Sequence, residues 1–237
     1  MITIVGDTHT HSVACDHAFS TLSENVAQAK KLGHRFLCVT EHAPALPGSA
    51  SRVHFATLPS ILPNEIDGIE LIKGVELNIL DYDGAVDLPL HLYSELEWVI
   101  ASYHTPCLVA GSVAEHTRGW IKIAENPHIQ VVGHCGREGY EFECAPVLEA
   151  FKACGKIVEI NAHSLRRPQS VKNCREIASL CARMAIPIVV CSDAHINLNV
   201  GAVEPAIRML DEIGFPEELV LNADYDRFMR ALGRDIP

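Results

Sequence analysis

Short apolar runs recur along the chain, and most of them end at a histidine, an aspartate or a glutamate. The runs are four to six residues long and rich in valine, isoleucine and leucine, which is typical of buried strands in a parallel sheet. They lie at residues 2–5, 35–40, 71–75, 98–103, 129–133, 156–160 and 186–191. The pattern predicts seven β-strands.

The segments between these runs carry helical patterns. The first helix is expected to begin near Thr21, because Thr21 and Glu24 have the spacing of a capping box, and to end at Gly33. Strands that alternate with helices predict a parallel β/α fold, and no linker divides it, so residues 1–237 are interpreted as a single domain. Further helices are expected at 145–154, 168–184, 200–213 and 223–232.

Residues 43–65 interrupt this alternation. They are rich in Pro, Gly, Ser and Ala and show no clean period, so we expect a long loop. Such a loop would cross the site described next, with His54 and Phe55 closest to a bound molecule.

The residues that follow the strands are the strongest chemical signal in the chain. In a β/α barrel the carboxyl ends of all strands meet at one rim, so side chains far apart in sequence converge there. His9 and His11 share one face because residues two apart on a strand point the same way, and Asp7 is expected to orient one of the two rings. The full set of expected metal ligands is His9, His11, His17, His42, Glu76, His104, His134, Asp193 and His195.

That set is too large for one ion. A single zinc ion takes three or four protein ligands, so nine groups indicate two or three metals. Glu76 is the natural bridge, because each of its two oxygens can bind one cation. Paired ions roughly 3.5–4 Å apart are typical of enzymes that displace groups at phosphorus.

Bulk composition narrows the class of protein. The chain has 237 residues, of which 48% are hydrophobic, and this supports a globular core. A formal net charge of −11 argues against a nucleic-acid or membrane-surface protein, and we expect no membrane span and no secretory leader. The nine cysteines lack regular spacing, so we expect reduced thiols in a cytoplasmic protein, with Cys15 and Cys135 packed and not bound to metal.

The motifs at the strand ends resemble those of the PHP superfamily (polymerase and histidinol phosphatase). The resemblance spans the whole chain and is strongest to the YcdX-type bacterial phosphatases. It implies a distorted (βα)7 barrel, a variant of the TIM barrel, with a trinuclear metal site. The residues that carry it are Asp7-Thr8-His9-Thr10-His11, His17, Glu41-His42, Gly74-Val75-Glu76, His104, His134 and Asp193-Ala194-His195.

By this resemblance, three divalent ions share the nine ligands. The implied reaction is hydrolysis of a small phosphomonoester by a metal-bridged hydroxide, with Glu76, Asp193 and His195 as catalytic residues. Zinc fits such imidazole-rich sites, and manganese or iron also fits a bridging carboxylate. The implied ligand sets are His9, His11, Glu76 and Asp193 for one ion, Glu76, His104 and His134 for a second, and His17, His42 and His195 for a third.

Four residues outside the ligand set are candidates for binding the substrate. Arg166 and Arg167 follow the sixth expected strand, where two guanidinium groups could clamp a phosphate, although an exposed basic turn explains them equally well. His163 and His54 are expected near the rim. The remaining histidines are expected to be solvated surface residues, namely His34, His91, His116 and His128.

Other functions remain open from the sequence alone. Within the same family the alternatives are a histidinol phosphatase and a phosphodiesterase or nuclease, the nuclease being disfavoured by the acidic charge. A metal-dependent amidohydrolase also begins with His-x-His but does not need His17, His42 and His195. A regulatory module that keeps the barrel is expected to lack ligands, and none of the nine is missing here. The sequence leaves the oligomeric state open, a homo-oligomer included.

Overall fold

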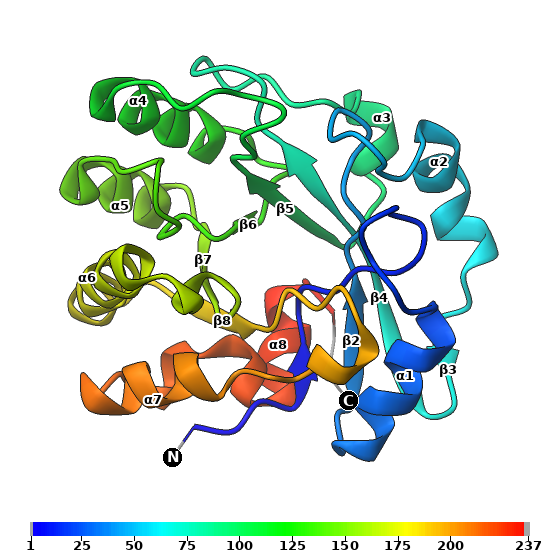
Figure 1. Cartoon of the computed structure of the whole chain (residues 1–237). Helices are drawn as coiled ribbons and strands as arrows, with labels where there is room; N and C mark the ends of the chain where they lie inside the picture. The colour runs from blue at the N-terminus through cyan, green and yellow to red at the C-terminus, as the bar shows by residue number, and fades with distance from the viewer. Residues whose placement is uncertain (1, 235–237) are drawn as a thin grey trace.

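Seven parallel strands curl into a nearly closed barrel in the computed structural model, which describes residues 2–234 (Figure 1). Their order across the sheet follows the chain, which confirms the expected distorted (βα)7 barrel. A two-residue strand, β3 (Glu65–Ile66), pairs antiparallel with the start of β4. The parallel strands are β1 (Gly6–Asp7), β2 (Phe36–Val39), β4 (Ile69–Asn78), β5 (Trp98–Ser102), β6 (Val131–Val132), β7 (Ile157–Asn161) and β8 (Ile188–Cys191).

Helices surround the sheet, with α4 to α7 along one side of the view and α1 to α3 along the other (Figure 1). Among residues 2–234, none of the helices combines the length and the apolar character that a bilayer crossing requires. The helices are α1 (Leu22–Lys31), α2 (Arg52–Ile61), α3 (Leu90–Tyr93), α4 (Val113–Ala124), α5 (Cys144–Ala153), α6 (Pro168–Met184), α7 (Glu204–Glu212) and α8 (Tyr225–Ala231), with short 3-10 helices η1 (Ser164–Arg166), η2 (Asn197–Asn199), η3 (Glu217–Leu219) and η4 (Leu221–Ala223).

Asn222 bridges the gap between the first strand and the last. Beyond the strand ends, Thr10 and Ala194 form an isolated parallel bridge. Lower down, the buried side chain of Asn222 accepts a hydrogen bond from the backbone N–H of Val190 and donates to the carbonyls of Val190 and Gly6. One amide therefore satisfies backbone groups of both edges where they do not pair directly.

The lower part of the barrel interior is apolar. Phe228 of α8 stacks on Phe36 of β2 with ring centroids 4.2 Å apart, and its centroid lies 5.0 Å from that of Trp98 at the start of β5. All three side chains are fully buried. Helix α8 therefore seals the end of the barrel where the strands begin.

The upper part of the interior is polar. Side chains alternate along a strand, so Glu76 shares the inner face of β4 with Ile72, and Glu159 shares that of β7 with Ile157. Both carboxylates are buried. The alternation that builds the apolar core thus also places two carboxylates above it.

The first strand begins later than the apolar run indicates. Residues 2–5 lie outside the sheet, and β1 is limited to Gly6–Asp7. The backbone N–H of Val5 donates to the carbonyl of Asn222, while the Val5 carbonyl accepts from the N–H of Arg35. Because these bonds go to two separate segments, no regular ladder forms there.

The expected long loop at residues 43–65 is wrong. Helix α2 occupies Arg52–Ile61, and β3 follows it. Phe55 and Leu58, one turn apart, are buried in the core and give the helix an apolar face. Two apolar residues do not make a helical pattern that can be recognised in the sequence. The helix becomes evident only with the core surface against which they pack.

The capping box of α1 is present as expected and gives a stability prediction. The Thr21 hydroxyl accepts from the N–H of Glu24, and the Glu24 carboxylate accepts from the N–H of Thr21. Thr21→Ala should lower the free energy of unfolding by about 1 kcal/mol, measured by chemical denaturation. Thr57→Ala, in exposed mid-helix on α2, is the control and should change it far less. Equal losses in the two variants would contradict a role for the cap.

Candidate metal centre

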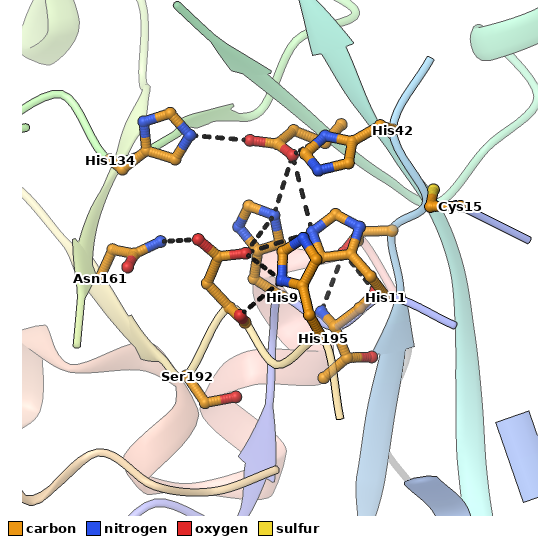
Figure 2. A network of polar contacts seen from close by, with 12 residues as sticks. His9, His11, Cys15, His42, His134, Asn161, Ser192 and His195 are labelled. Atoms are coloured by element: carbon orange, nitrogen blue, oxygen red, sulfur yellow. Dashed lines mark hydrogen bonds and ion pairs between the residues drawn. The ribbon is translucent and has the colours of Figure 1, made fainter. Parts of the chain in front are cut away.

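The structure brings all nine expected ligands to the carboxyl-terminal end of the barrel, although they come from loops and ends of six strands. The ring of His11 stacks on that of His42 and lies close to that of His195, with centroids 4.1 and 4.3 Å apart. Figure 2 shows these three residues in one cluster with His9. Glu76 lies at the centre and is almost fully enclosed, with 1% of its side chain exposed. The convergence inferred from the strand ends is therefore present in the fold.

Four of these side chains surround one point. Nε2 of His9 lies 3.3 Å from Oε2 of Glu76 and 3.8 Å from Oδ1 of Asp193. Nε2 of His11 lies 3.7 and 3.3 Å from the same two oxygens. An ion held tetrahedrally at about 2.1 Å from each ligand places those ligands about 3.4 Å apart. These four distances, 3.3 to 3.8 Å, are close to those between ligands of one tetrahedrally held ion.

The other oxygen of Glu76 faces a second group. Oε1 lies 3.0 Å from Nε2 of His134 and 3.4 Å from Nε2 of His104. The two imidazole nitrogens are 3.3 Å apart. These three atoms also have the mutual spacing of ligands to one ion. Glu76 is therefore positioned to present one oxygen to each group.

The third expected group is less compact. The ring centroids of His17, His42 and His195 are 4.9 to 5.6 Å apart. A tighter group on this side joins His11 to His42 and His195, and another joins His42 to Glu76 and His104, each with ligand atoms within 4.8 Å of one another. His17 is exposed and would have to turn toward its neighbours for the three expected imidazoles to share an ion.

Several polar atoms of the centre are buried without a hydrogen-bond partner among the described residues. An unsatisfied buried polar group costs roughly 1–3 kcal/mol, so a cluster of them calls for an explanation. Bound cations would supply the missing partners, and imidazole nitrogens with carboxylate oxygens suit divalent transition metals. The atoms are Nε2 of His9, both ring nitrogens of His11 and Oδ1 of Asp193, together with Nδ1 of His42 and Oε2 of Glu76, which lie 2.6 Å apart without the geometry of a hydrogen bond.

Two other compact groups do not offer free ligand atoms in this way. Glu41 already accepts from the backbone N–H and the hydroxyl of Ser12, and Glu159 accepts from a ring nitrogen of His9 and from the N–H of His134. Both carboxylates therefore hold the scaffold together. The two groups are His11, Cys15 and Glu41, and His9, Glu159 and Cys191.

Glu159 orients His9, a role that we did not anticipate from the sequence. Its Oε1 accepts from Nδ1 of His9 at 2.7 Å, which leaves the lone pair of Nε2 directed at Glu76 and Asp193. Its Oε2 accepts from the N–H of His134 at 2.8 Å. One carboxylate thus positions both ligand groups. The sign of this role in the sequence is the position of Glu159, a charged residue inside an apolar strand.

The expectation that Asp7 orients a ring is wrong. Its carboxylate accepts hydrogen bonds from the N–H and hydroxyl of Ser192 and from the N–H of Gly201. Asp7 therefore fastens the first strand to the segment that carries Asp193, and Glu159 has the orienting role instead.

Asn78 orients His104 in a comparable way. Its Nδ2 donates to the carbonyl of Ala43 and to Asp87, so its Oδ1 is the atom that accepts from Nδ1 of His104 at 2.7 Å. Nε2 of His104 then carries the lone pair that faces Glu76.

The backbone is held in an unusual conformation at two expected ligands. His134 has φ +27° and Asp193 has φ +55°, in the region that disfavours residues with a Cβ. The other oxygen of Asp193 accepts from Nδ2 of Asn161 at 3.2 Å (Figure 2). Strained backbone of this kind clusters at functional sites, where the surroundings maintain it.

The pKa values of the histidines show which positions in the centre favour a positive charge. Burial disfavours a charged His9, but Glu159, Glu76 and Asp193 outweigh it and raise the pKa of His9 well above its ordinary value. Burial and neighbouring imidazoles lower the pKa of His11, and burial lowers the pKa of His42 to about 4. The three carboxylates thus favour a positive charge at His9, which a bound cation could supply in place of the proton. His11 and His42 favour the neutral form, which metal binding requires.

The centre forms the floor of a pocket of about 640 Å³. Arg166, Arg167 and His163 line this pocket, as expected from their position after a strand. Arg137 lines it too and was not anticipated, although it follows β6 as Arg166 follows β7. His54 lies on α2 with its ring 5.0 Å from Phe55, and among the described residues it is not part of the lining.

His34 and His116 are buried, contrary to expectation. Nδ1 of His116 donates to the carbonyl of Glu141 at 2.8 Å, and its Nε2 accepts from the N–H of Gly111 at 3.0 Å. With both nitrogens satisfied, His116 stabilises the loop after β5. His91 is exposed as expected.

Sequence comparison relates the chain to known proteins. A family model described as PHP domain matches residues 7–163. A probable phosphatase of Caldanaerobacter subterraneus is 41% identical over 232 residues, covering 97% of this chain and 91% of the relative. A probable phosphatase of Caldicellulosiruptor saccharolyticus is 39% identical over 227 residues and covers 95% of each chain.

Solved structures share the fold at much lower identity. Histidinol phosphate phosphatase from Lactococcus lactis, in complex with zinc, L-histidinol and phosphate, matches with a TM-score of 0.64 at 18% identity, over 90% of this chain and 95% of that one. An amidohydrolase from Bifidobacterium longum matches with a TM-score of 0.51 at 12% identity, over 99% and 100% of the two chains. These likenesses establish the barrel fold. The chemistry has to be inferred from the residues of the site.

Proposed function

The chain belongs to the PHP domain family, in its phosphatase branch, and from this premise we propose that it hydrolyses small phosphomonoesters at a centre of three divalent metal ions. The observation that carries the proposal is Glu76, whose Oε1 faces His104 and His134 at 3.0 to 3.4 Å. Its Oε2 faces His9 and His11 at 3.3 to 3.7 Å and Nδ1 of His42 at 2.6 Å. The unpartnered buried atoms around it support the same reading.

The ligands divide into three sets in this proposal. The first two sets correspond to the compact groups on either side of Glu76. The third rests on the resemblance of His17, His42 and His195 to family ligands and on their neighbouring rings. The sets are His9, His11, Glu76 and Asp193, then Glu76, His104 and His134, and finally His17, His42 and His195.

The protein's own residues would act mainly by holding tautomers and charges in place. When bound, the ions would supply an activated water near neutral pH and neutralise charge on the phosphate. We assign Glu76, Asp193 and His195 to the catalytic centre. Nδ1 of His195 donates to the backbone carbonyl of Asp193 at 3.0 Å, so its Nε2 is free for binding at the pocket wall.

Zinc is the metal that this donor set favours, because imidazole nitrogens dominate it. The Lactococcus lactis phosphatase, whose structure contains zinc, supports the choice by fold likeness. Manganese or iron also suits a bridging carboxylate, so reconstitution should compare the three metals.

Metal removal tests the proposal directly. The purified protein should contain at least two divalent ions per chain by elemental analysis and should hydrolyse a chromogenic phosphate ester. Chelator treatment should lower the rate by at least about tenfold, and zinc, manganese or iron should restore it, because the unsatisfied ligands need a cation. Full activity in a protein shown to be free of metal would refute the proposal.

The same assay distinguishes the rival functions. An amidohydrolase with this barrel would cleave amide substrates and leave the phosphate ester intact. A regulatory module would hydrolyse neither. The close relatives named probable phosphatases favour the phosphate ester.

A further inference from the structure

One side of the pocket mouth is unusually rich in arginine for an acidic protein. The chain carries a formal net charge of −11, yet Arg137, Arg166 and Arg167 all line the one pocket that holds the candidate metal centre. They come from the neighbouring strand ends of β6 and β7, so the fold places them on a common side. Such local concentration of charge attracts and orients anions.

These arginines are only partly neutralised by the protein. Within residues 2–234, Arg167 has a carboxylate partner, Glu138, at 3.2 Å, whereas the ion pairs of the described chain include neither Arg137 nor Arg166. Arg137 is moreover half-buried. A partly buried guanidinium without an anion is unfavourable, and a bound anion would relieve it.

The arginines and Glu76, which joins the two compact ligand groups, lie at different depths. Glu76 has 1% of its side chain exposed at the floor, while the side chain of Arg167 is 53% exposed, and Arg166 is also exposed. A phosphate held at the floor is therefore served by the ligand cluster. The exposure of Arg166 and Arg167 leaves their side chains accessible to a part of the substrate nearer the mouth.

We propose that Arg137 and Arg166 form a subsite for a second anionic group on the substrate, a carboxylate or a further phosphate, separate from the phosphate that is hydrolysed. This inference rests on the proposed phosphatase function and adds the substrate class. Arginine binds both kinds of oxyanion through paired hydrogen bonds. The same basic side disfavours a leaving group that carries an amine, as L-histidinol does.

Matched substrates test the subsite. The wild-type protein should prefer 3-phosphoglycerate to glycerol 3-phosphate, or fructose 1,6-bisphosphate to fructose 6-phosphate, by about tenfold in kcat/KM, the effect of one charged hydrogen-bonded contact. The two pairs distinguish a carboxylate from a second phosphate. Histidinol phosphate should be a poorer substrate than either preferred compound. In the double variant Arg137→Gln/Arg166→Gln the ratios should fall toward one, whatever happens to the absolute rates.

A binding measurement tests the same subsite without catalysis. Calorimetric titration should compare phosphonates that end in a carboxylate with alkylphosphonates of equal length, using short and long chains. We expect about tenfold tighter binding of the carboxylates by the wild-type protein and loss of that preference in the double variant. Arg183→Gln, an equal charge change at an exposed site on α6, should keep it.

The outcomes separate the two proposals. Absence of any preference in the wild-type protein, or a preference that survives in the double variant, overturns the subsite while phosphatase activity stands. If none of the phosphate esters is hydrolysed, the proposed function is refuted. The calorimetric preference then tests the subsite independently.

Discussion

Glu76→Gln should lower kcat/KM for a chromogenic phosphate ester by more than about 10²-fold and remove most of the bound metal. Residues that merely orient metal ligands typically matter by 10- to 100-fold, and Glu76 is placed to bind directly. Its Oε2 faces His9, His11 and His42 while its Oε1 faces His104 and His134. Glutamine keeps the shape but replaces one of these oxygens by an amide nitrogen, which cannot bind a cation.

The control for this variant is Glu149→Gln, the same chemical change at an exposed position of α5. It should leave the metal content, by elemental analysis, and the rate close to the wild-type values. Thermal unfolding shows whether each variant is folded. A folded Glu76→Gln protein that retains its full metal complement would reject the bridging position of this residue.

Glu159→Gln should lower metal affinity and kcat/KM by about 10- to 100-fold, although Glu159 belongs to none of the proposed ligand sets. Its two oxygens accept from Nδ1 of His9 and from the N–H of His134. Glutamine can accept only one of these bonds through its single oxygen. An amide NH₂ facing His9 would also favour the tautomer that carries its proton on Nε2, the nitrogen that faces Glu76.

Excess metal separates this positioning role from a purely structural one. If Glu159 acts by orienting His9, raising the zinc concentration should recover part of the lost activity, because weaker binding is overcome by mass action. Because bound zinc also stabilises the folded protein, the recovery counts as positioning only if thermal unfolding shows that the variant is folded without added zinc. Unchanged metal affinity in the folded variant would show that another group sets the orientation of His9.

The contrast between Glu76 and Glu159 shows what limits the prediction of site residues from the sequence. Both residues lie on inner faces of parallel strands. Glu76 was recognised because it ends an apolar run, whereas Glu159 lies inside one, where a charged residue resembles an exception to the pattern. Its role depends on His9, 150 positions away in sequence, which the structure brings to 2.7 Å.

Helix α2 illustrates a second limit. Its only buried residues, Phe55 and Leu58, are too few to produce a helical period, and the surrounding Pro and Ser favour a loop. The interpretation of His54 as a residue near the bound molecule depended on that loop. With the helix in place, His54 packs beside Phe55, and the pocket wall is supplied by residues such as Arg137.

The sequence by itself determined the alternation of strands and helices and the identity of the groups at the strand ends. It could do so because apolar runs report burial locally, and because parallel strands in a barrel bring all their ends to one rim. Only the tertiary structure decided which atoms face one another. The rotation of each ring is set by an acceptor on another strand, Glu159 for His9 and Asn78 for His104. Such contacts depend on distances across the barrel, which no local pattern of residues contains.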